Sequence, residues 1–342
     1  MSKARFLLSK GVVLKKFSEI SSLADVVSYS LKTNFEVGKV LEKETDCFFS
    51  VHSLNSLKRL SDFSRVWFFL QGNSVGEIEE LFGLGVCSFV VDNVNDLNSI
   101  LGFAEKNNKR INLLLRLRVK EHSIHTGRFF VFGFYSKDIN RLLPELSANS
   151  CVLKLGVHFH RKTQNVSEWF LKDELEYAVL PENFRFIDFV NIGGGFPSVY
   201  KNFKAEVFDD VFFRVKELRH WLNEKNVKLI VEPGRFIAAP AVKLEAEIIN
   251  VYDNNVIVNC SVFNAFMDVF IANIRLLVEG ELDKGTPFTV KGCTPDSLDI
   301  FRYSVFLDDP KIGDKIIFLN AGAYNFHSDF CGLDRIETVV VE

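Results

Sequence analysis

The sequence contains eight short apolar segments separated by stretches of helical periodicity, and this alternation constrains the fold more than any other feature. The segments cover residues 26–31, 47–51, 66–70, 88–91, 111–117, 152–159, 187–192 and 227–231. Strands that alternate with helices are typical of parallel βα units, and near-continuous apolar runs suit strands buried on both faces. Eight such units predict an α/β fold with a TIM-like (β/α)8 barrel.

The pattern changes near residue 240, where strand-like segments follow one another without long helices between them. The strand candidates lie within residues 242–263, with a turn at 253–255, and at 287–291, 304–307, 315–319 and 338–341. They predict a mostly antiparallel C-terminal β domain, to which residues 5–9 can add a strand. The expected division is therefore a barrel at 20–240 and a β domain made of 1–19 and 241–342.

Composition and charge exclude several classes of protein. The chain is 47% hydrophobic and 25% charged, which is typical of a globular protein. Its 44 acidic and 41 basic residues form no long run of one sign, so we expect neither nucleic acid nor membrane as a partner. The sequence has no apolar stretch as long as a signal peptide or membrane span, which predicts a cytoplasmic protein. Its six cysteines form no CxxC pair, and we expect no bound metal.

Polar residues and glycines follow most of the predicted barrel strands, at the end where such barrels carry their chemistry. They are Lys32, His52, Ser53, Arg116, Arg118, His158, His160, Gly193, Gly194, Gly195, Glu232, Gly234 and Arg235. A lysine, histidines, a glycine-rich turn, an acid and an arginine on one face suit a phosphorylated cofactor that forms a Schiff base.

Each of these residues also has a simpler interpretation when it is taken alone. A glycine triplet often only turns a corner, Arg235 can form a surface ion pair, and a lysine is usually a solvated charge. At the end of a buried strand, however, burial would lower the pKa of Lys32 and expose its nucleophilic amine.

Six motifs, taken together, resemble those of the fold-type III pyridoxal-phosphate decarboxylases. This family includes ornithine, arginine and diaminopimelate decarboxylases and shares its barrel with alanine racemase. The motifs occupy residues 29–34 (YSLKTN), 156–160 (GVHFH), 192–197 (IGGGFP), 232–235 (EPGR), 292–299 and 322–324 (GAY). They follow the family's order over nearly the whole chain, so the resemblance implies its fold and its cofactor, pyridoxal 5′-phosphate (PLP).

The resemblance also implies a role for individual residues. Lys32 would carry the cofactor on its amine, His160 would stack on the pyridine ring and Glu232 would bind the ring nitrogen. The remaining cofactor-binding candidates are Arg116, Thr163, Gly193, Gly194, Gly195, Gly234, Arg235 and Tyr324. A carboxylate at the ring nitrogen favours decarboxylation, whereas alanine racemases place an arginine there. His158 is expected to pack or bond elsewhere than on the ring.

The motif at 292–299 (GCTPDSLD) departs from the family pattern, G-P-x-C-[DE]-x-x-D. The family's cysteine, which protonates Cα after decarboxylation, aligns with Pro295. Cys293 lies two positions earlier and is our candidate for that role. In the alternative, Cys293 is merely packed and water or Lys32 gives the proton.

The residues expected to bind the substrate depart from the ornithine decarboxylase type as well. Asp296 matches an aspartate that crosses the dimer interface to the substrate's distal amine, but Ala272 takes the place of the second such aspartate. Asp268 lies about one helical turn earlier, and Ser50 stands where the family often has an aspartate. His327, Asp329 and Phe330 either line the pocket or pack. A basic, diamino, conjugated or carboxylated amino acid is compatible with these positions.

The sequence therefore predicts a homodimeric PLP-dependent amino-acid decarboxylase whose active sites are shared between subunits. Its amine product would serve the synthesis of polyamines or of siderophore-type metabolites. Two alternatives stay open at this point. Pro295 and Ala272 suit a non-catalytic regulatory homologue of ornithine decarboxylase, and an amino-acid racemase shares the scaffold, although Glu232 speaks against it.

Overall fold

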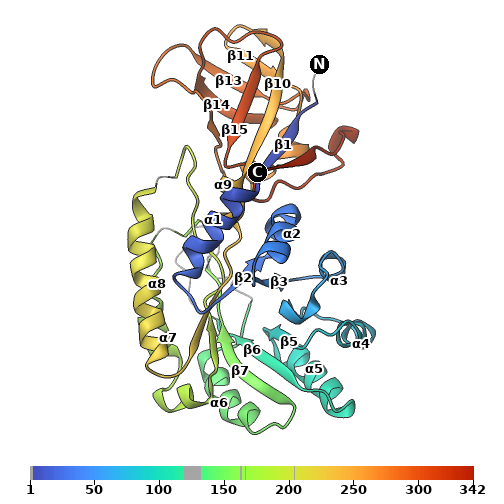
Figure 1. Cartoon of the computed structure of the whole chain (residues 1–342), viewed down its shortest axis with the longest axis vertical. Helices are drawn as coiled ribbons and strands as arrows, with labels where there is room; N and C mark the ends of the chain where they lie inside the picture. Colours follow the sequence, from blue (N-terminus) through green and yellow to red (C-terminus); the bar gives the residue numbers. More distant parts are fainter. Residues whose placement is uncertain (1–2, 119–131, 162–163, 166, 204) are drawn as a thin grey trace.

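The computed structural model describes residues 3–118, 132–161, 164–165, 167–203 and 205–342, and its centre is a closed parallel barrel. The barrel strands are β2 (Val26–Ser30), β3 (Phe48–Val51), β4 (Val66–Phe69), β5 (Ser88–Val91), β6 (Ile111–Arg116), β7 (Val152–His158), β8 (Phe189–Asn191) and β9 (Lys228–Val231). Pairing of β2 with β9 closes the ring. In the view of Figure 1, the barrel lies below the second, sheet-containing part of the molecule. Each of the eight predicted segments contains one strand, so the predicted barrel is confirmed.

Helices connect the strands and cover the outside of the barrel. They are α1 (Lys10–Ser21), α2 (Phe35–Glu44), α3 (Leu54–Leu57), α4 (Val75–Gly83), α5 (Val94–Lys106), α6 (Ser136–Ser147), α7 (Leu171–Ala178), α8 (Phe208–Asn223) and α9 (Arg235–Ala241). Their sequences explain where they begin and which face they bury. In α4, Ser74 and Glu77 form a capping box, and Ile78 and Leu81 are buried one turn later.

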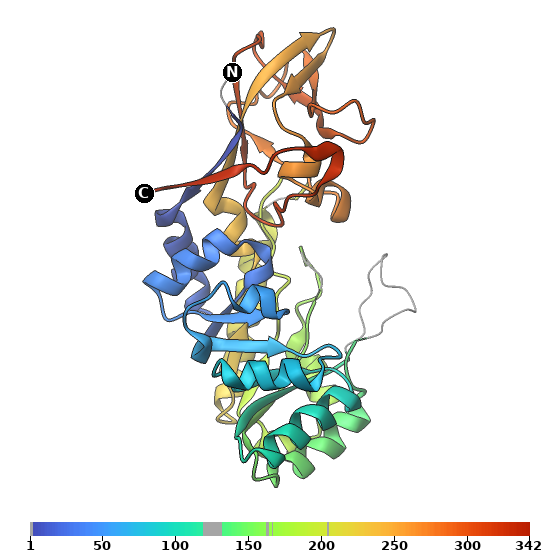
Figure 2. The same ribbon diagram turned by 90° about the vertical axis from the view of Figure 1, so that its right-hand side faces the viewer.

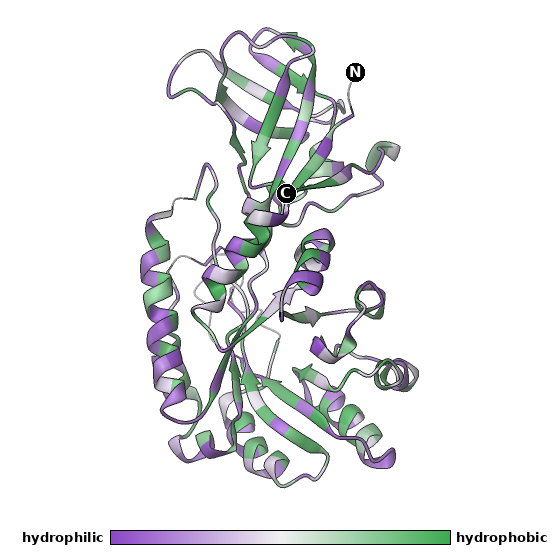
Figure 3. Ribbon diagram, in the orientation of Figure 1, coloured by the Kyte–Doolittle hydropathy of each residue, from purple (hydrophilic) through white to green (hydrophobic). Residues whose placement is uncertain are grey.

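Phenylalanine fills much of the barrel core. Phe49, Phe68 and Phe89, on successive strands, are fully buried, as is Phe159 just after β7. Figure 3 shows the resulting concentration of apolar residues on the strands, against the mixed surface of α8. Burial of each such side chain contributes about 1.5–3 kcal/mol.

The second part of the molecule is a mostly antiparallel sheet, as predicted. Its strands are β1 (Arg5–Ser9), β10 (Val242–Tyr252), β11 (Asn255–Val258), β12 (Leu277–Val278), β13 (Pro287–Lys291), β14 (Ile300–Phe306), β15 (Lys315–Leu319) and β16 (Glu337–Val341). β1 pairs antiparallel with β10 and parallel with β16, so the first and last strands of the chain lie side by side (Figure 2). The short helices α10 (Val262–Ala265) and α11 (Asp268–Ile271) follow β11.

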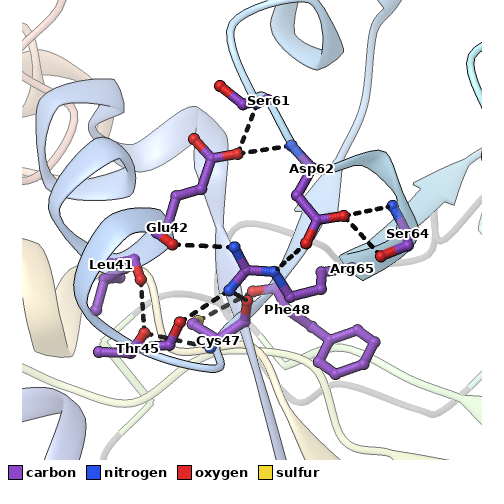
Figure 4. A network of polar contacts seen from close by, with 9 residues as sticks. All are labelled: Leu41, Glu42, Thr45, Cys47, Phe48, Ser61, Asp62, Ser64 and Arg65. Atoms are coloured by element: carbon purple, nitrogen blue, oxygen red, sulfur yellow. Dashed lines mark hydrogen bonds and ion pairs between the residues drawn. The ribbon is translucent and has the colours of Figure 1, made fainter.

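A polar network lies at the base of the barrel, where β4 begins (Figure 4). Arg65 donates hydrogen bonds to the backbone oxygens of Thr45 (2.8 Å) and Glu42 (2.9 Å) at the end of α2. Its Nε also donates to Asp62 (2.8 Å). The guanidinium therefore ties α2 to the start of β4.

Two further features concern only the described part of the chain. None of its helices is both long and apolar enough to cross a membrane. It also contains no group of three or more His, Cys, Asp or Glu side chains placed to hold a metal ion.

Candidate active site

A cavity of about 370 Å³ opens at the carboxyl ends of the barrel strands. Among its lining residues are nine predicted ones: Lys32, Arg116, His160, Gly194, Gly195, Glu232, Gly234, Arg235 and Tyr324. The first eight follow or end barrel strands, and Tyr324 reaches the cavity from the chain after β15. The structure thus brings residues together that are up to 292 positions apart.

Lys32 lies in the 3₁₀ turn Leu31–Thr33, directly after β2. Partial desolvation lowers the pKa of its amine, the carboxylate of Glu232 opposes this shift, and Arg116 adds to it. A lowered pKa increases the fraction of free amine, which is the nucleophilic form.

Glu232 follows β9 and is 5% exposed. Its Oε1 accepts hydrogen bonds from Ser50 Oγ (2.8 Å) and Asn191 Nδ2 (2.9 Å), and Ser28 Oγ lies 2.8 Å from Ser50 Oγ. Burial alone would raise the pKa of Glu232, but His158 and the hydrogen-bond donors outweigh burial and lower the pKa to about 2. The carboxylate is therefore held ionised beneath the cavity.

His158, at the end of β7, contacts this carboxylate from the other side. Its Nε2 lies 3.6 Å from Oε2 of Glu232, and its ring meets Phe69 edge-on with centroids 5.2 Å apart. Burial lowers the pKa of His158, although Glu232 opposes the shift. Ser50 and His158 therefore both contact the carboxylate of Glu232, which the sequence did not predict.

The glycine turn after β8 needs residues without a Cβ. A Cβ on Gly193, whose φ is 64°, would lie 2.6 Å from the backbone oxygen of Phe159, and one on Gly194 would lie 2.9 Å from that of Glu232. The Gly193 N–H donates to Asn191 Oδ1 and the Gly194 N–H to His160 Nδ1. The N–H groups of Gly193 and Gly194 are therefore used within the protein.

Arg235 is buried and held by an acidic partner that the sequence did not predict. Its Nη1 donates to Asp268 Oδ2 (2.5 Å) and to Tyr200 Oη (3.0 Å), and its guanidinium lies 5.0 Å from the ring centroid of Tyr324. Arg235 and Asp268 are only 3% and 1% exposed. Asp268 is thus engaged by Arg235, which leaves it no role in binding the distal amine of a substrate.

Some of the predicted residues do not line this cavity. Ser53 caps α3, and Arg118 stacks over Tyr135, 4.3 Å from its ring centroid. Thr163 lies outside the described residues.

The substrate and proton-donor candidates also lie elsewhere, on the β domain. They are Cys293, Asp296, Asp329 and Phe330. Phe330 stacks on Phe263 with centroids 4.0 Å apart. None of the four is among the residues that line the cavity containing Lys32.

The loop that carries Cys293 is organised by a buried carboxylate. Asp299 accepts hydrogen bonds from Val262 N (2.8 Å) and from both Thr294 N (3.0 Å) and Thr294 Oγ1 (2.7 Å). A Cβ on Gly292 would lie 2.1 Å from Asp299, which explains the glycine. Cys293 is left exposed, and partial burial together with Asp299 raises the pKa of its thiol.

The cavity also contains polar residues that the sequence analysis missed. Gln71 and Asp92 lie just beyond β4 and β5 and line the same cavity, beside His52, which stacks on Phe69. Their signal is present in the sequence, because Gln71 and Asp92 are polar residues that closely follow predicted barrel strands, as Lys32 and Glu232 do.

The residues of this cavity fit PLP. They supply a partly desolvated lysine amine, an ionised carboxylate, a buried guanidinium and a glycine turn, which match the aldehyde, ring nitrogen and phosphate of the cofactor. A Cβ on Gly234 would lie 2.2 Å from the buried hydroxyl oxygen of Thr33, so the turn after β9 has no room for a side chain and its backbone can approach a phosphate closely.

Comparison with known proteins gives the same result. Residues 15–239 match the model of the pyridoxal-binding domain of the pyridoxal-dependent decarboxylases. A probable ornithine decarboxylase from Dictyostelium discoideum is 25% identical over 95% of this chain and 76% of its own length. A 2-[(L-alanin-3-ylcarbamoyl)methyl]-2-hydroxybutanedioate decarboxylase from Staphylococcus aureus is 24% identical over 76% of this chain and 72% of its own.

Among solved structures, the lysine/ornithine decarboxylase of Vibrio vulnificus has a TM-score of 0.82 at 21% identity, covering 99% of this chain and 94% of that one. This likeness confirms the fold, a barrel with an attached sheet domain. The family match and the donor set together confirm the cofactor. The chain belongs to the pyridoxal-dependent decarboxylase family, and it is a PLP-dependent amino-acid decarboxylase.

Proposed function

We propose that this enzyme decarboxylates a basic, diamino or conjugated ornithine-like amino acid, and that its amine product serves polyamine or siderophore-type metabolite synthesis. The observation that carries the decarboxylation is the ionised carboxylate of Glu232, fixed by Ser50 and Asn191 within the cavity that contains Lys32. PLP supplies the electron sink for the electron pair left at Cα when carbon dioxide departs.

Each residue of the barrel mouth would have a separate role in binding the cofactor or in catalysis. Lys32 would carry the cofactor and yield it to the α-amine of the substrate, and its lowered pKa makes this exchange easier. Glu232 would hold a proton at the pyridine nitrogen. His160 would stack on the ring, and Arg235 would bind the phosphate with Tyr324 beside it.

Three further groups complete the proposed cofactor site. Arg116 would support the cofactor from β6. Gly193, Gly194 and Gly195 would let the backbone approach the phosphate closely, as would Gly234, since none of them carries a Cβ. We also include Thr163 in the proposal, as a residue that would bind the phosphate.

Cys293 would return a proton to Cα after decarboxylation. The raised pKa keeps its thiol protonated near neutral pH, which a proton donor requires. Because Cys293 is exposed in one chain and does not line the cavity that contains Lys32, it would act in the site of a second copy. A Cys293→Ser variant is expected to lower kcat by at least about 100-fold with an unchanged unfolding midpoint. An unchanged kcat would assign the proton to water or Lys32.

A homodimer is supported by an aromatic cluster on the β domain, consisting of Phe263, Phe270 and Phe330, of which Phe270 and Phe330 are exposed. Beside it, Ile271 is 64% exposed. Such an apolar patch suits an interface between copies of the chain. An Ile271→Asp variant should sediment as a monomer and lose activity, whereas an active monomer would contradict the shared site. Pairing of β1 with β10 supports the proposed division at 20–240, with 1–19 joined to 241–342.

The choice of substrate follows from the distal side of the site. Ala272 has no charged side chain, and Asp268 is paired with Arg235. Neither position therefore supplies a second carboxylate for the terminal ammonium of a diamino substrate. Asp296 would bind the distal amine of a diamino substrate, with Asp329 and Phe330 beside it. The Staphylococcus aureus relative is named for a substrate whose side-chain nitrogen is acylated, which supports a conjugated ornithine-like amino acid as the alternative to ornithine.

The test is mass spectrometry of the cofactor-loaded protein after incubation with a panel of amino acids. The panel contains ornithine, lysine, arginine, meso-diaminopimelate, carboxynorspermidine and citryl-ornithine, and Lys32→Ala is the control. We expect one product lighter than its substrate by carbon dioxide and absent with the control. Retention of every carboxylate, with racemised α-carbons, would overturn the proposal.

A further inference from the structure

A second cavity, of about 660 Å³, lies between the barrel and the β domain. Lys32 lines both this cavity and the one at the barrel mouth. The remaining walls come from the start of α2, from Arg59 beyond α3, and from the chain on either side of the 3₁₀ turn Phe330–Gly332. The two cavities therefore adjoin at Lys32, and a substrate whose α-amine reaches Lys32 lies beside this second space.

The floor of the second cavity is fixed by amide side chains. Asn34 donates to the backbone oxygen of Gly322 (2.8 Å) and to Asn325 Oδ1 (3.3 Å), and its own Oδ1 caps α2. Asn264 donates to the backbone oxygen of Asp334 (2.9 Å). The two contacts of Asn34 join the barrel to the β domain, and that of Asn264 joins two segments of the β domain, so these walls of the cavity are fixed by the chain itself.

The charge of the lining favours an anion. Arg59 and Arg335 line the cavity, and neither has a carboxylate within 4.0 Å among the residues that the structure describes. The guanidinium of Arg59 is stacked 3.7 Å from the ring centroid of Phe35, which orients it. The lining contains two acids, Glu36 and Glu337, and the carboxylate of Glu36 is paired with Lys39 (3.0 Å).

From this charge and shape we propose that the second cavity is a subsite for a carboxylate-bearing distal group of the substrate, with Arg59 and Arg335 as its binding residues. Guanidinium groups bind carboxylates through two parallel hydrogen bonds, and a cavity of this size accepts a group as large as a tricarboxylic acid. This inference rests on the proposed function, because it selects the conjugated amino acids within the proposed substrate class.

The first experiment measures binding alone. Calorimetric titration of the full-length, cofactor-loaded protein with citrate, at matched ionic strength, should give saturable binding. Arg59→Gln and Arg335→Gln should each weaken it at least tenfold, since each removes a charge-assisted pair. Arg110→Gln is the control, because Arg110 is an exposed arginine just before β6 and lines neither cavity. Absence of citrate binding, or equal binding by all four proteins, overturns the subsite.

The second experiment measures specificity. The ratio of kcat/KM for citryl-ornithine to that for ornithine should fall at least tenfold in Arg335→Gln, and an unchanged ratio overturns the subsite. The two proposals fail separately. Citrate binding without decarboxylation of any amino acid refutes the proposed function, whereas decarboxylation without arginine-dependent citrate binding refutes the subsite.

Discussion

The two ends of the barrel both hold a charged side chain in a polar network, but they use it differently. At the mouth, Glu232 is 5% exposed and faces a cavity, and its Oε1 takes two side-chain donors. At the base, the side chain of Arg65 is 19% exposed and donates hydrogen bonds to Thr45, Glu42 and Asp62 (Figure 4).

The difference shows what each network is for. The partners of Arg65 are mostly backbone oxygens at the end of α2, so its charge fastens one segment of chain to the next. Within the part of the chain that the structure describes, the second carboxylate oxygen of Glu232 accepts no hydrogen bond at normal distance, since His158 Nε2 is 3.6 Å away. Burying a charge costs free energy, so a buried carboxylate whose second oxygen faces a cavity without a close donor indicates a ligand-binding role.

The largest expected effect tests whether the mouth also contains purely structural charge. Asp268→Ala leaves Arg235 buried without its anionic partner and should lower the free energy of unfolding by about 3–5 kcal/mol. Urea unfolding of the cofactor-free protein measures this change. Asp268→Asn keeps an acceptor for Arg235 and should cost less. An Asp268→Ala protein as stable as wild type would mean that the pair contributes nothing.

The next effect concerns activity. Glu232→Gln retains an oxygen that can accept from Ser50 and Asn191, but it removes the charge. We expect kcat to fall by about 100- to 1,000-fold, comparable to the loss of one preorganised electrostatic contact in other enzymes. Steady-state decarboxylation assays give kcat, and circular dichroism confirms that the variant is folded. A loss below tenfold would show that the ionised carboxylate is not needed.

The same carboxylate makes stability depend on pH. Its folded pKa of about 2 lies below the unfolded value of 4.5, so its contribution is complete above pH 4.5 and disappears as the pH falls through about 2. The shift corresponds to about 3 kcal/mol. The gap in unfolding midpoint between cofactor-free wild type and Glu232→Gln should therefore narrow from pH 6 to pH 2. A gap that stays constant would contradict the lowered pKa.

The sequence predicted the fold and the residues of the mouth well, because both follow from local patterns. The segment 88–91 coincides with β5, and 287–291 and 315–319 coincide with β13 and β15. Lys32 and Glu232 were expected to meet because the carboxyl ends of parallel strands share one face of a barrel. The sheet domain followed from strand-like segments that lack helices between them.

The partners of these residues could not be predicted, because they depend on packing between distant segments. Ser50 and Glu232 are 182 positions apart, and Arg235 and Asp268 are 33 apart. No local periodicity links such pairs. The donors to Glu232 and the acid beside Arg235 became visible only once the closed barrel and the turn of α11 had set their distances.

The smallest effect tests the base of the barrel. Arg65→Ala removes hydrogen bonds from a charged donor to the end of α2 and should lower the free energy of unfolding by about 2 kcal/mol. Its kcat should stay within about twofold of wild type, since none of the contacts that Arg65 makes with described residues reaches the mouth and the base of such barrels serves stability. Urea unfolding and steady-state assays on the same preparation separate the two quantities, with Arg110→Gln as the surface control. A fall in kcat as large as that of Glu232→Gln would break the division between the two ends, because the base would then control the chemistry through the strand that joins them.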